Sequence, residues 1–171
     1  MSFGFVEEQS AILKAIGRAY AKGITMFAAA SNDGANREDN ISWPAKIQEV
    51  ICVHSGSGGG TKSRFTPWAS DNHRVMVLGE CVKSLGTYMS GTSCATPIAA
   101  GIAACILDYA RRVGLSEDEL LKLRRTEYMR KMFKIMKKEE REDYWWIIPW
   151  SFFNDKRSDP WIADQMRIAI R

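Results

Sequence analysis

The first thirty residues change from a helical to a strand-like pattern of hydrophobic positions. From Glu7 to Lys22, apolar residues recur every three or four positions with basic residues between them, which predicts an amphipathic helix. Gly23 supplies the left-handed residue that commonly ends a helix. Ile24 to Ala30 is a continuous apolar run too short for a helix, which is typical of a strand buried on both faces. A helix that leads into a buried strand indicates an α/β fold.

Three later segments extend this pattern. The short apolar runs Val50 to Val53 and Val75 to Leu78 predict two more buried strands. Thr92 to Arg112 carries Pro97 near its start and almost no charge before Asp108, which predicts a helix buried on nearly all sides. We therefore expect an α/β three-layer fold with a mainly parallel sheet.

The composition changes after Gly114. Lys, Arg and Glu alternate there, and Ser116 followed by Glu119 has the spacing of a capping box that opens a new helix. An imperfect apolar stripe then runs to Lys138, and a compact aromatic segment follows from Tyr144 to Trp150. We predict a first domain over residues 1–113 and a helical, charged and aromatic C-terminal extension over residues 114–171.

Composition excludes several classes of function. The 171 residues are 46% hydrophobic and 26% charged, which is the balance of a globular protein. The net charge of +4 is not gathered into a basic block, so we expect no nucleic-acid partner. We find no run of about 18 to 20 apolar residues and no basic-then-apolar leader, so we expect no membrane association.

The cysteines and histidines give no support for a metal site. Four cysteines at positions 52, 81, 94 and 105 share no CxxC-type spacing, and the chain has two histidines. Three of the four lie in apolar runs, so we expect small buried side chains in a reducing compartment, with a disulfide framework as the alternative, which favours an intracellular protein. We predict no metal ion and no cofactor.

Residues 91–97, Gly-Thr-Ser-Cys-Ala-Thr-Pro, carry the strongest chemical signal. Gly91 allows a tight turn, and Ser93 falls in the first turn of the predicted helix, where unpaired N–H groups and the helix dipole favour negative charge. An alkoxide or oxyanion would be stabilised there. On these residues alone, Thr92 or Ser93 as a simple helix cap remains an alternative.

The same segment resembles the nucleophile motif of the subtilisin-like peptidases, Gly-Thr-Ser-Met-Ala-x-Pro. The resemblance implies that Ser93 is the serine that forms the acyl-enzyme. Cys94 replaces the family's Met, and we interpret it as a packing residue. The alternative is that Cys94 itself is the nucleophile.

Two further segments are similar to the same family. Residues 28–34, Ala-Ala-Ala-Ser-Asn-Asp-Gly, resemble its Ala-Ala-Gly-Asn-x-Gly segment, which implies that Asn32 donates its amide to the oxyanion hole. Ser31 stands where the family has Gly. Residues 2–4 resemble its Ser-x-Gly substrate-binding strand. The resemblance therefore implies a peptide or protein substrate bound by these residues: Ser2, Phe3, Gly4, Ala30 and Ser31.

The resemblance extends over about residues 1–112 and implies a serine-type endopeptidase with a subtilisin-like fold that is truncated at its N-terminal side. In this family the triad Asp and His precede the Ser-x-Gly strand. Neither His54 nor His73 lies in a His-Gly-Thr setting, so we expect both to be structural or surface residues. We expect this chain alone to be inactive unless an upstream segment with Asp and His joins it. A non-catalytic interaction module derived from such a protease is the alternative.

The glycine-rich loop at residues 56–63 suggests a different activity, phosphate binding. It follows a strand and ends in Lys62-Ser63, as a phosphate-binding loop does. Thr61 occupies the position of the required glycine, and Pro67 falls where the following helix would begin. We therefore predict no nucleotide site in this loop.

Overall fold

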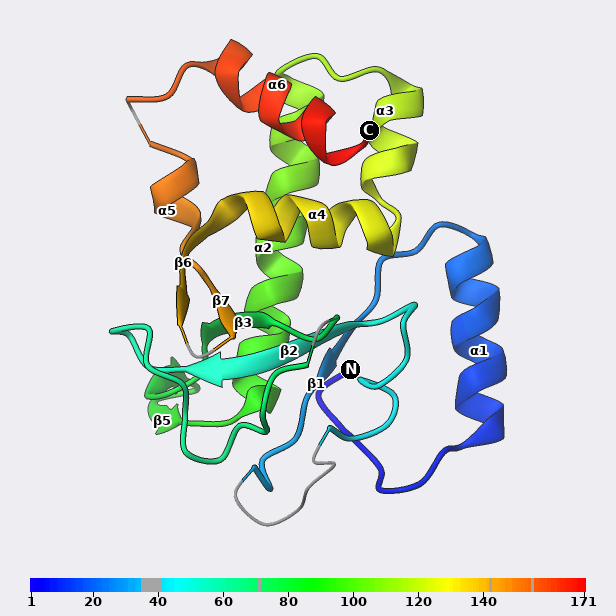
Figure 1. The fold of residues 1–171 in the computed structure, drawn as a ribbon, viewed down its shortest axis with the longest axis vertical. Helices are drawn as coiled ribbons and strands as arrows, with labels where there is room; N and C mark the ends of the chain where they lie inside the picture. The colour runs from blue at the N-terminus through cyan, green and yellow to red at the C-terminus, as the bar shows by residue number, and fades with distance from the viewer. Residues whose placement is uncertain (35–40, 71, 142, 155) are drawn as a thin grey trace.

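A five-stranded sheet forms the centre of the computed structural model, which describes residues 1–34, 41–70, 72–141, 143–154 and 156–171. The strand order is β1-β2-β3-β7-β6. The first four strands run parallel, and β6 pairs with β7 in the antiparallel direction (Figure 1). The strands span β1 (Phe27–Ala29), β2 (Ile51–Gly56), β3 (Val75–Leu78), β6 (Lys137–Arg141) and β7 (Tyr144–Ile147). The expected α/β fold with a mainly parallel sheet is confirmed.

Alternate residues of the parallel strands face two different helical layers. On one face, Phe27, Ile51 and Val75 belong to a large apolar cluster with helix α2 (Thr92–Arg112) and the C-terminal helices. On the other face, Ala28 and Cys52 belong to a smaller cluster that includes Ile16 of helix α1 (Ser10–Ala21). This alternation explains why the strands read as continuous apolar runs.

Helix α2 has the predicted bounds, but it is buried on one face only. Its buried residues face the sheet and the C-terminal helices, while Ala100, Ala104 and Cys105 are exposed on the opposite face. The expectation of burial on nearly all sides is wrong for the described residues, because the sheet covers a single face. By length and composition alone, the helix is also long and apolar enough to cross a membrane. This differs from the sequence analysis, which found no apolar run of that length. A core helix passes the same test, and α2 packs against β1, β2 and β3.

The segment after Gly114 was expected to be helical. It contains helices, but it also supplies strands β6 and β7 to the sheet. Strand β7 pairs with β3 in parallel, with Val75 opposite Trp145 and Met76 opposite Trp146. Its aromatic and β-branched residues suit a pleated, buried surface. The helices of this segment are α3 (Glu117–Leu123), α4 (Thr126–Met136), α5 (Pro149–Phe152) and α6 (Asp159–Ala169).

The two parts of the chain share one core. The large apolar cluster contains Ile106 of α2 together with Phe133 of α4 and Met166 of α6. The rings of Phe27 and Phe133 lie 5.8 Å apart. The composition of the chain changes at Val113, but apolar side chains from both sides of this position pack together.

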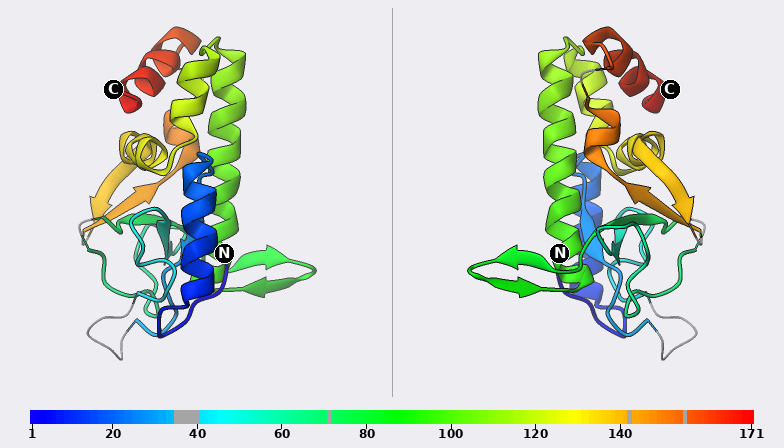
Figure 2. Two further views of the ribbon diagram at one scale, coloured as in Figure 1. Left: turned by 90° about the vertical axis from the view of Figure 1, so that its right-hand side faces the viewer. Right: turned by 90° about the vertical axis from the view of Figure 1, so that its left-hand side faces the viewer.

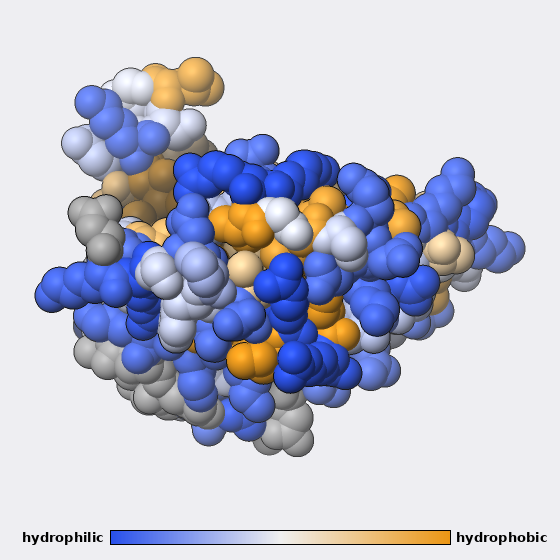
Figure 3. Space-filling model, turned by 90° about the horizontal axis from the view of Figure 1, so that it is seen from above, coloured by the Kyte–Doolittle hydropathy of each residue, from blue (hydrophilic) through white to orange (hydrophobic). Residues whose placement is uncertain are grey.

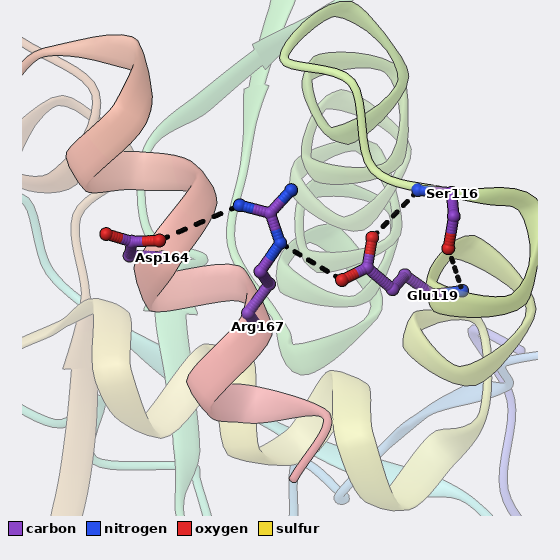
Figure 4. Close-up of polar contacts among 4 residues, drawn as sticks. All are labelled: Ser116, Glu119, Asp164 and Arg167. Carbon is purple, nitrogen blue, oxygen red and sulfur yellow. Dashed lines mark hydrogen bonds and ion pairs between the residues drawn. The ribbon is translucent and has the colours of Figure 1, made fainter.

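The predicted capping box at the start of α3 is confirmed and is linked to α6. Glu119 N–H donates to the Ser116 side chain at 3.2 Å, and Ser116 N–H donates to the Glu119 carboxylate at 2.8 Å. Arg167 of α6 donates to the same carboxylate at 3.0 Å and lies 3.7 Å from Asp164 (Figure 4). The hydrogen bond from the Ser116 backbone, with help from Arg167, lowers the pKa of the Glu119 carboxyl.

A two-stranded hairpin projects from the body next to the start of α2. Its strands are β4 (Val82–Ser84) and β5 (Thr87–Met89), and the two green arrows of Figure 2 extend away from the other layers. Leu85, Tyr88 and Met89 are exposed on it. Seen from above, where α3 and α6 lie in Figure 1, the surface is largely hydrophilic with several apolar patches (Figure 3).

Candidate active site

Ser93 is the second residue of α2, and the helix begins directly after Gly91, which has an unusual backbone conformation. Gly91 has φ 158° and ψ 157°, and a Cβ placed on it would lie 3.3 Å from Asn32 Nδ2. The positive φ and this close approach both favour glycine. The turn brings the first residues of α2 against the end of β1, which lies sixty residues earlier in the chain.

Asn32 is held in one orientation by Thr92. Its Oδ1 accepts the Thr92 backbone N–H at 2.9 Å and the Thr92 hydroxyl at 3.0 Å. Because a backbone N–H can only donate, the oxygen of the amide must face Thr92, and Nδ2 is the remaining donor. The Thr92 hydroxyl also lies 3.2 Å from the Ser31 carbonyl oxygen.

The Ser93 backbone N–H is the second donor at this place. In the first turn of α2, Thr92 N–H donates to Asn32, while the N–H groups of Cys94 and Ala95 donate to Gly91 O. The Ser93 N–H has no acceptor among the residues that the structure describes. Such N–H groups at a helix N-terminus favour a negative charge. Asn32 and Ser93 can therefore offer two donors to one oxyanion.

The N-terminal strand lies beside Ser93. Met1 O accepts the Ala29 N–H at 3.0 Å, so residues 1–2 extend along the edge of β1. The Ser93 hydroxyl donates to the Ser2 carbonyl at 3.2 Å. Further along, Phe5 and Trp43 exchange two backbone hydrogen bonds of 2.8 and 2.9 Å.

Ser93 opens onto a cavity of about 230 Å³ between these segments. Three of the residues expected to bind substrate line this cavity, namely Phe3, Gly4 and Ser31. Ala30 does not line it, because it is fully buried and its backbone bonds to Val53 and Ser42. The cavity is also lined by residues that the sequence analysis did not identify as substrate-binding: Ala29, Asp33, Ser42 and Thr92.

Sequence reasoning missed Asp33 and Ser42 for different reasons. Asp33 lies within the Ala-Ala-Gly-Asn-x-Gly motif, but it occupies the position x, which any residue can fill and which therefore gives no signal. Ser42 lies on a segment with no chemical signal, and it reaches the cavity because its N–H donates to Ala30 O at 2.7 Å.

Neither histidine contacts Ser93. His54 is buried in β2, where Nε2 lies 2.9 Å from His73 O and Nδ1 lies 3.3 Å from the Thr66 hydroxyl. Burial lowers the pKa of His54 to about 3. His73 Nδ1 lies 2.8 Å from the Ser70 hydroxyl, and burial followed by the charge of Arg130 lowers its pKa. Both side chains therefore have hydrogen-bond partners away from Ser93.

All four cysteines are free thiols, but they are not all buried as expected. Cys52 is buried in β2 and Cys94 is half-buried in α2, whereas Cys81 and Cys105 are exposed. Burial raises the pKa of the Cys52 thiol. The expectation is wrong for Cys105 because it lies on the face of α2 away from the sheet, and for Cys81 because it precedes the projecting hairpin. The described residues contain no group of three or more His, Cys, Asp or Glu side chains that could hold a metal ion.

The parallel sheet, the central helix and the serine at its N-terminus define a protein of the α/β class with a serine-centred cavity. A model of the subtilase family matches residues 1–130. The chain therefore belongs to the subtilase family, which is a family of serine proteases.

Curated relatives match the same region. Over 113 residues the chain is 38% identical to subtilisin DY of Bacillus licheniformis, and the match covers 63% of this chain and 41% of that protein. It is 34% identical to subtilisin E of Bacillus subtilis (strain 168), covering 63% of this chain and 29% of that protein. The chain thus spans well under half the length of these relatives.

Solved structures show the same fold. The prenylagaramide maturation protease PagA matches with a TM-score of 0.67 and 21% identity, covering 100% of this chain and 61% of that one. The self-cleaved protease domain of PatA matches with a TM-score of 0.66 and 21% identity, covering 96% and 58%. Since these matches include the region after Gly114, the strands and helices there are compatible with the fold of these proteases.

Proposed function

We propose that this chain supplies the nucleophile and the oxyanion hole of a serine endopeptidase, and that the base comes from outside the chain. Ser93 is the nucleophile, and Asn32 with the Ser93 N–H binds the oxyanion. Peptides or proteins are the substrates. Membership of a family of serine proteases supports this assignment.

One observation carries the proposal. The Asn32 amide oxygen accepts the Thr92 backbone N–H, so its Nδ2 is a donor next to the start of α2 with no acceptor among the described residues. The Ser93 N–H and hydroxyl belong to that same turn. The N-cap residue of α2 is Gly91, and neither the Thr92 nor the Ser93 side chain makes a capping hydrogen bond there.

The chemistry follows from these groups. Ser93 Oγ would attack the carbonyl carbon of the scissile bond while a base removes its proton. The carbonyl oxygen becomes an oxyanion that accepts hydrogen bonds from Asn32 Nδ2 and Ser93 N–H. Collapse of this intermediate returns the proton to the leaving amine and leaves an acyl group on Ser93, which water then hydrolyses.

The described residues place no base next to Ser93 that could accept its proton. A serine hydroxyl is a weak nucleophile at neutral pH unless a positioned base accepts its proton. Ser93 donates instead to the Ser2 carbonyl, and both histidines are engaged elsewhere. We therefore propose a partner segment that carries the Asp and His of the family.

Casein cleavage tests the proposal in two arms. The purified chain alone should not sustain cleavage, and adding a segment with the Asp and His motifs of a subtilisin relative should restore it. The restored activity should disappear in Ser93→Ala. Sustained cleavage by the chain alone would overturn the external base. No cleavage in the restored mixture, with the two parts bound to each other, would favour a non-catalytic interaction module.

A further inference from the structure

A cluster of buried polar side chains lies near the end of β2, next to the segments that carry Asn32 and Ser93. Its members are His54, Ser55, Ser63 and Thr66, and each is at most 4% exposed. Buried polar groups destabilise a fold unless they are paired. The proposed mechanism uses none of these side chains, so their contacts require a separate explanation.

Thr66 holds this cluster together through its hydroxyl group. Its Oγ1 accepts the Ser55 backbone N–H at 3.2 Å and lies 3.3 Å from His54 Nδ1. Burial keeps the His54 ring neutral, since it lowers the pKa to about 3. Nε2 lies 2.9 Å from His73 O, and because a carbonyl can only accept, the ring carries its proton there. Nδ1 is then an acceptor for the Thr66 hydroxyl, which is therefore bonded to β2 as both acceptor and donor.

The backbone of Thr66 contacts the turn that carries Asn32. Gly34 N–H donates to Phe65 O at 2.8 Å, and a Cβ placed on Gly34 would overlap the Thr66 carbonyl group. Asn32 precedes Gly34 by two residues, and its amide oxygen is held by Thr92. The position of Asn32 Nδ2 therefore depends on the backbone of Thr66 as well as on Thr92.

The other oxyanion donor is connected to the same cluster through Gly79. A Cβ on Gly79 would lie 2.9 Å from Ser55 Cβ and 3.0 Å from Ala95 Cβ, so its backbone packs closely against Ser55. Gly79 O accepts the N–H of Gly91, the N-cap residue of α2, at 2.8 Å. Both segments of the proposed oxyanion hole are thus attached to β2 by contacts that begin at Ser55 and Thr66.

We infer that Thr66 is a positioning residue for the oxyanion hole, and this inference rests on the proposed function. Its hydroxyl anchors the backbone that packs against Gly34, which keeps Asn32 Nδ2 at the place where the oxyanion forms. Without the hydroxyl, the Ser55 N–H and His54 Nδ1 lose their partner in a buried place, and the Thr66 backbone shifts. A shift of about 1 Å in a catalytic group can cost much of its effect on the transition state.

Three variants separate positioning from stability. Thr66→Val keeps the shape of the side chain and removes the hydroxyl, whereas Thr66→Ser keeps the hydroxyl. Thr126→Val is the matched control, because Thr126 is also buried and its hydroxyl donates to Glu49 O at 2.9 Å. Urea unfolding should show that both valine variants are less stable than the parent chain. A purely structural role for Thr66 would therefore make the two variants alike in every other measurement.

The side-chain amide of Asn32 reports its own position without catalysis. In NMR spectra of the isotope-labelled whole chain, its NH₂ signals are the pair that is missing in Asn32→Ala. Thr66→Val should shift or broaden this pair, while Thr66→Ser and Thr126→Val should leave it in place. His54→Phe removes the acceptor of the Thr66 hydroxyl, should shift the same pair, and is the test if Thr66→Val does not fold. Unchanged signals in Thr66→Val, or an equal change in Thr126→Val, would overturn the inference.

Kinetics of the chain with restored activity gives the second readout. With casein-derived peptides, Thr66→Val should lower kcat about tenfold with little change in KM, because only the oxyanion contact is displaced. Thr66→Ser should recover most of the kcat, and Thr126→Val should retain it. Equal kcat values for Thr66→Val and the parent would contradict the inference and leave the proposed function standing. Failure to restore cleavage in the parent would count against the proposed function alone, since the amide signals still decide whether Thr66 positions Asn32.

Discussion

The contacts of individual residues at the start of α2 decide what Ser93 and Asn32 can do. Thr92 orients the amide of Asn32, and Gly91 allows that amide to approach the helix. In the proposed mechanism the amide bonds more strongly to the oxyanion than to the ground-state carbonyl, so its effect belongs to the transition state.

Asn32→Ala should therefore lower kcat about 100-fold or more with little change in KM, because the lost donor stabilises the oxyanion and not the bound substrate. The measurement uses casein-derived peptides and the chain with activity restored by the partner segment. Asn72→Ala, at an exposed loop residue, is the matched control and should keep full activity. Unchanged kcat in the Asn32 variant would remove Asn32 from the mechanism.

His54 makes the stability of the fold depend on pH. Burial lowers its pKa to about 3 from an ordinary value near 6.5, so the folded state holds the neutral ring. The unfolded chain takes up a proton below about pH 6.5, so stability is fully present above that pH and is lost as the pH falls toward 3. His73 acts in the same direction.

Urea unfolding between pH 7 and pH 5 measures this effect. The free energy of unfolding should decrease below pH 6.5 by up to about 1.4 kcal/mol per pH unit because of His54, and His73 shifts it in the same direction. His54→Gln removes one titrating group and should flatten the dependence, even though the variant is less stable. A flat curve for the parent chain over this range would contradict the burial of a neutral His54.

At the scale of the elements, local patterns predicted most of the chain before Gly114. The bounds of α2 and β3 agree with the apolar runs, because both signals depend on neighbouring residues. Gly23 has the predicted positive φ of 66° after α1. The motif around Ser93 also identified the place where the cavity forms, since its residues are adjacent in sequence.

Pairings between distant segments could not be predicted in the same way. Strand β6 consists of charged residues, and it forms because Trp145 and its neighbours in β7 pair on one side with β3 and on the other with β6. The glycine-rich loop packs closely against β7, since a Cβ on Gly60 would lie 2.9 Å from Trp146. The contribution of Ser42 to the cavity likewise depends on a contact with Gly4 across the fold.

The capping box of α3 permits a test at this scale. Ser116→Ala removes the side-chain acceptor of Glu119 N–H and should lower the free energy of unfolding by about 1 kcal/mol. Ser84→Ala, in the exposed strand β4, is the matched control. Urea titration would detect the difference, and equal stability of the two variants would show that the cap contributes nothing.

For the whole molecule, the segment after Val113 covers surfaces that the first part needs to bury. It supplies β7 to the open edge of β3 and places α4 over β1. Thr126 donates to Glu49 O at 2.9 Å, and Arg130 donates to Gln48 O and Val50 O at the start of β2. These contacts join the two parts at several places.

A chain that ends at Val113 should therefore aggregate, because the edge of β3 and the apolar face of α2 would be exposed. Size-exclusion chromatography and urea unfolding, with the 171-residue chain run in parallel, would measure this. A soluble, monomeric fragment with a cooperative transition would contradict the shared core and support the domain boundary that composition predicts.

The central claim is that Ser93 is the nucleophile, and covalent labelling tests it most directly. A fluorophosphonate probe would be added to the chain after activity is restored by the partner segment, and the adduct would be located by mass spectrometry of its peptides. We expect stoichiometric labelling of Ser93, little labelling of the chain alone, and none in Ser93→Ala. An adduct on Ser90 or Cys94, or undiminished labelling in Ser93→Ala, would contradict it.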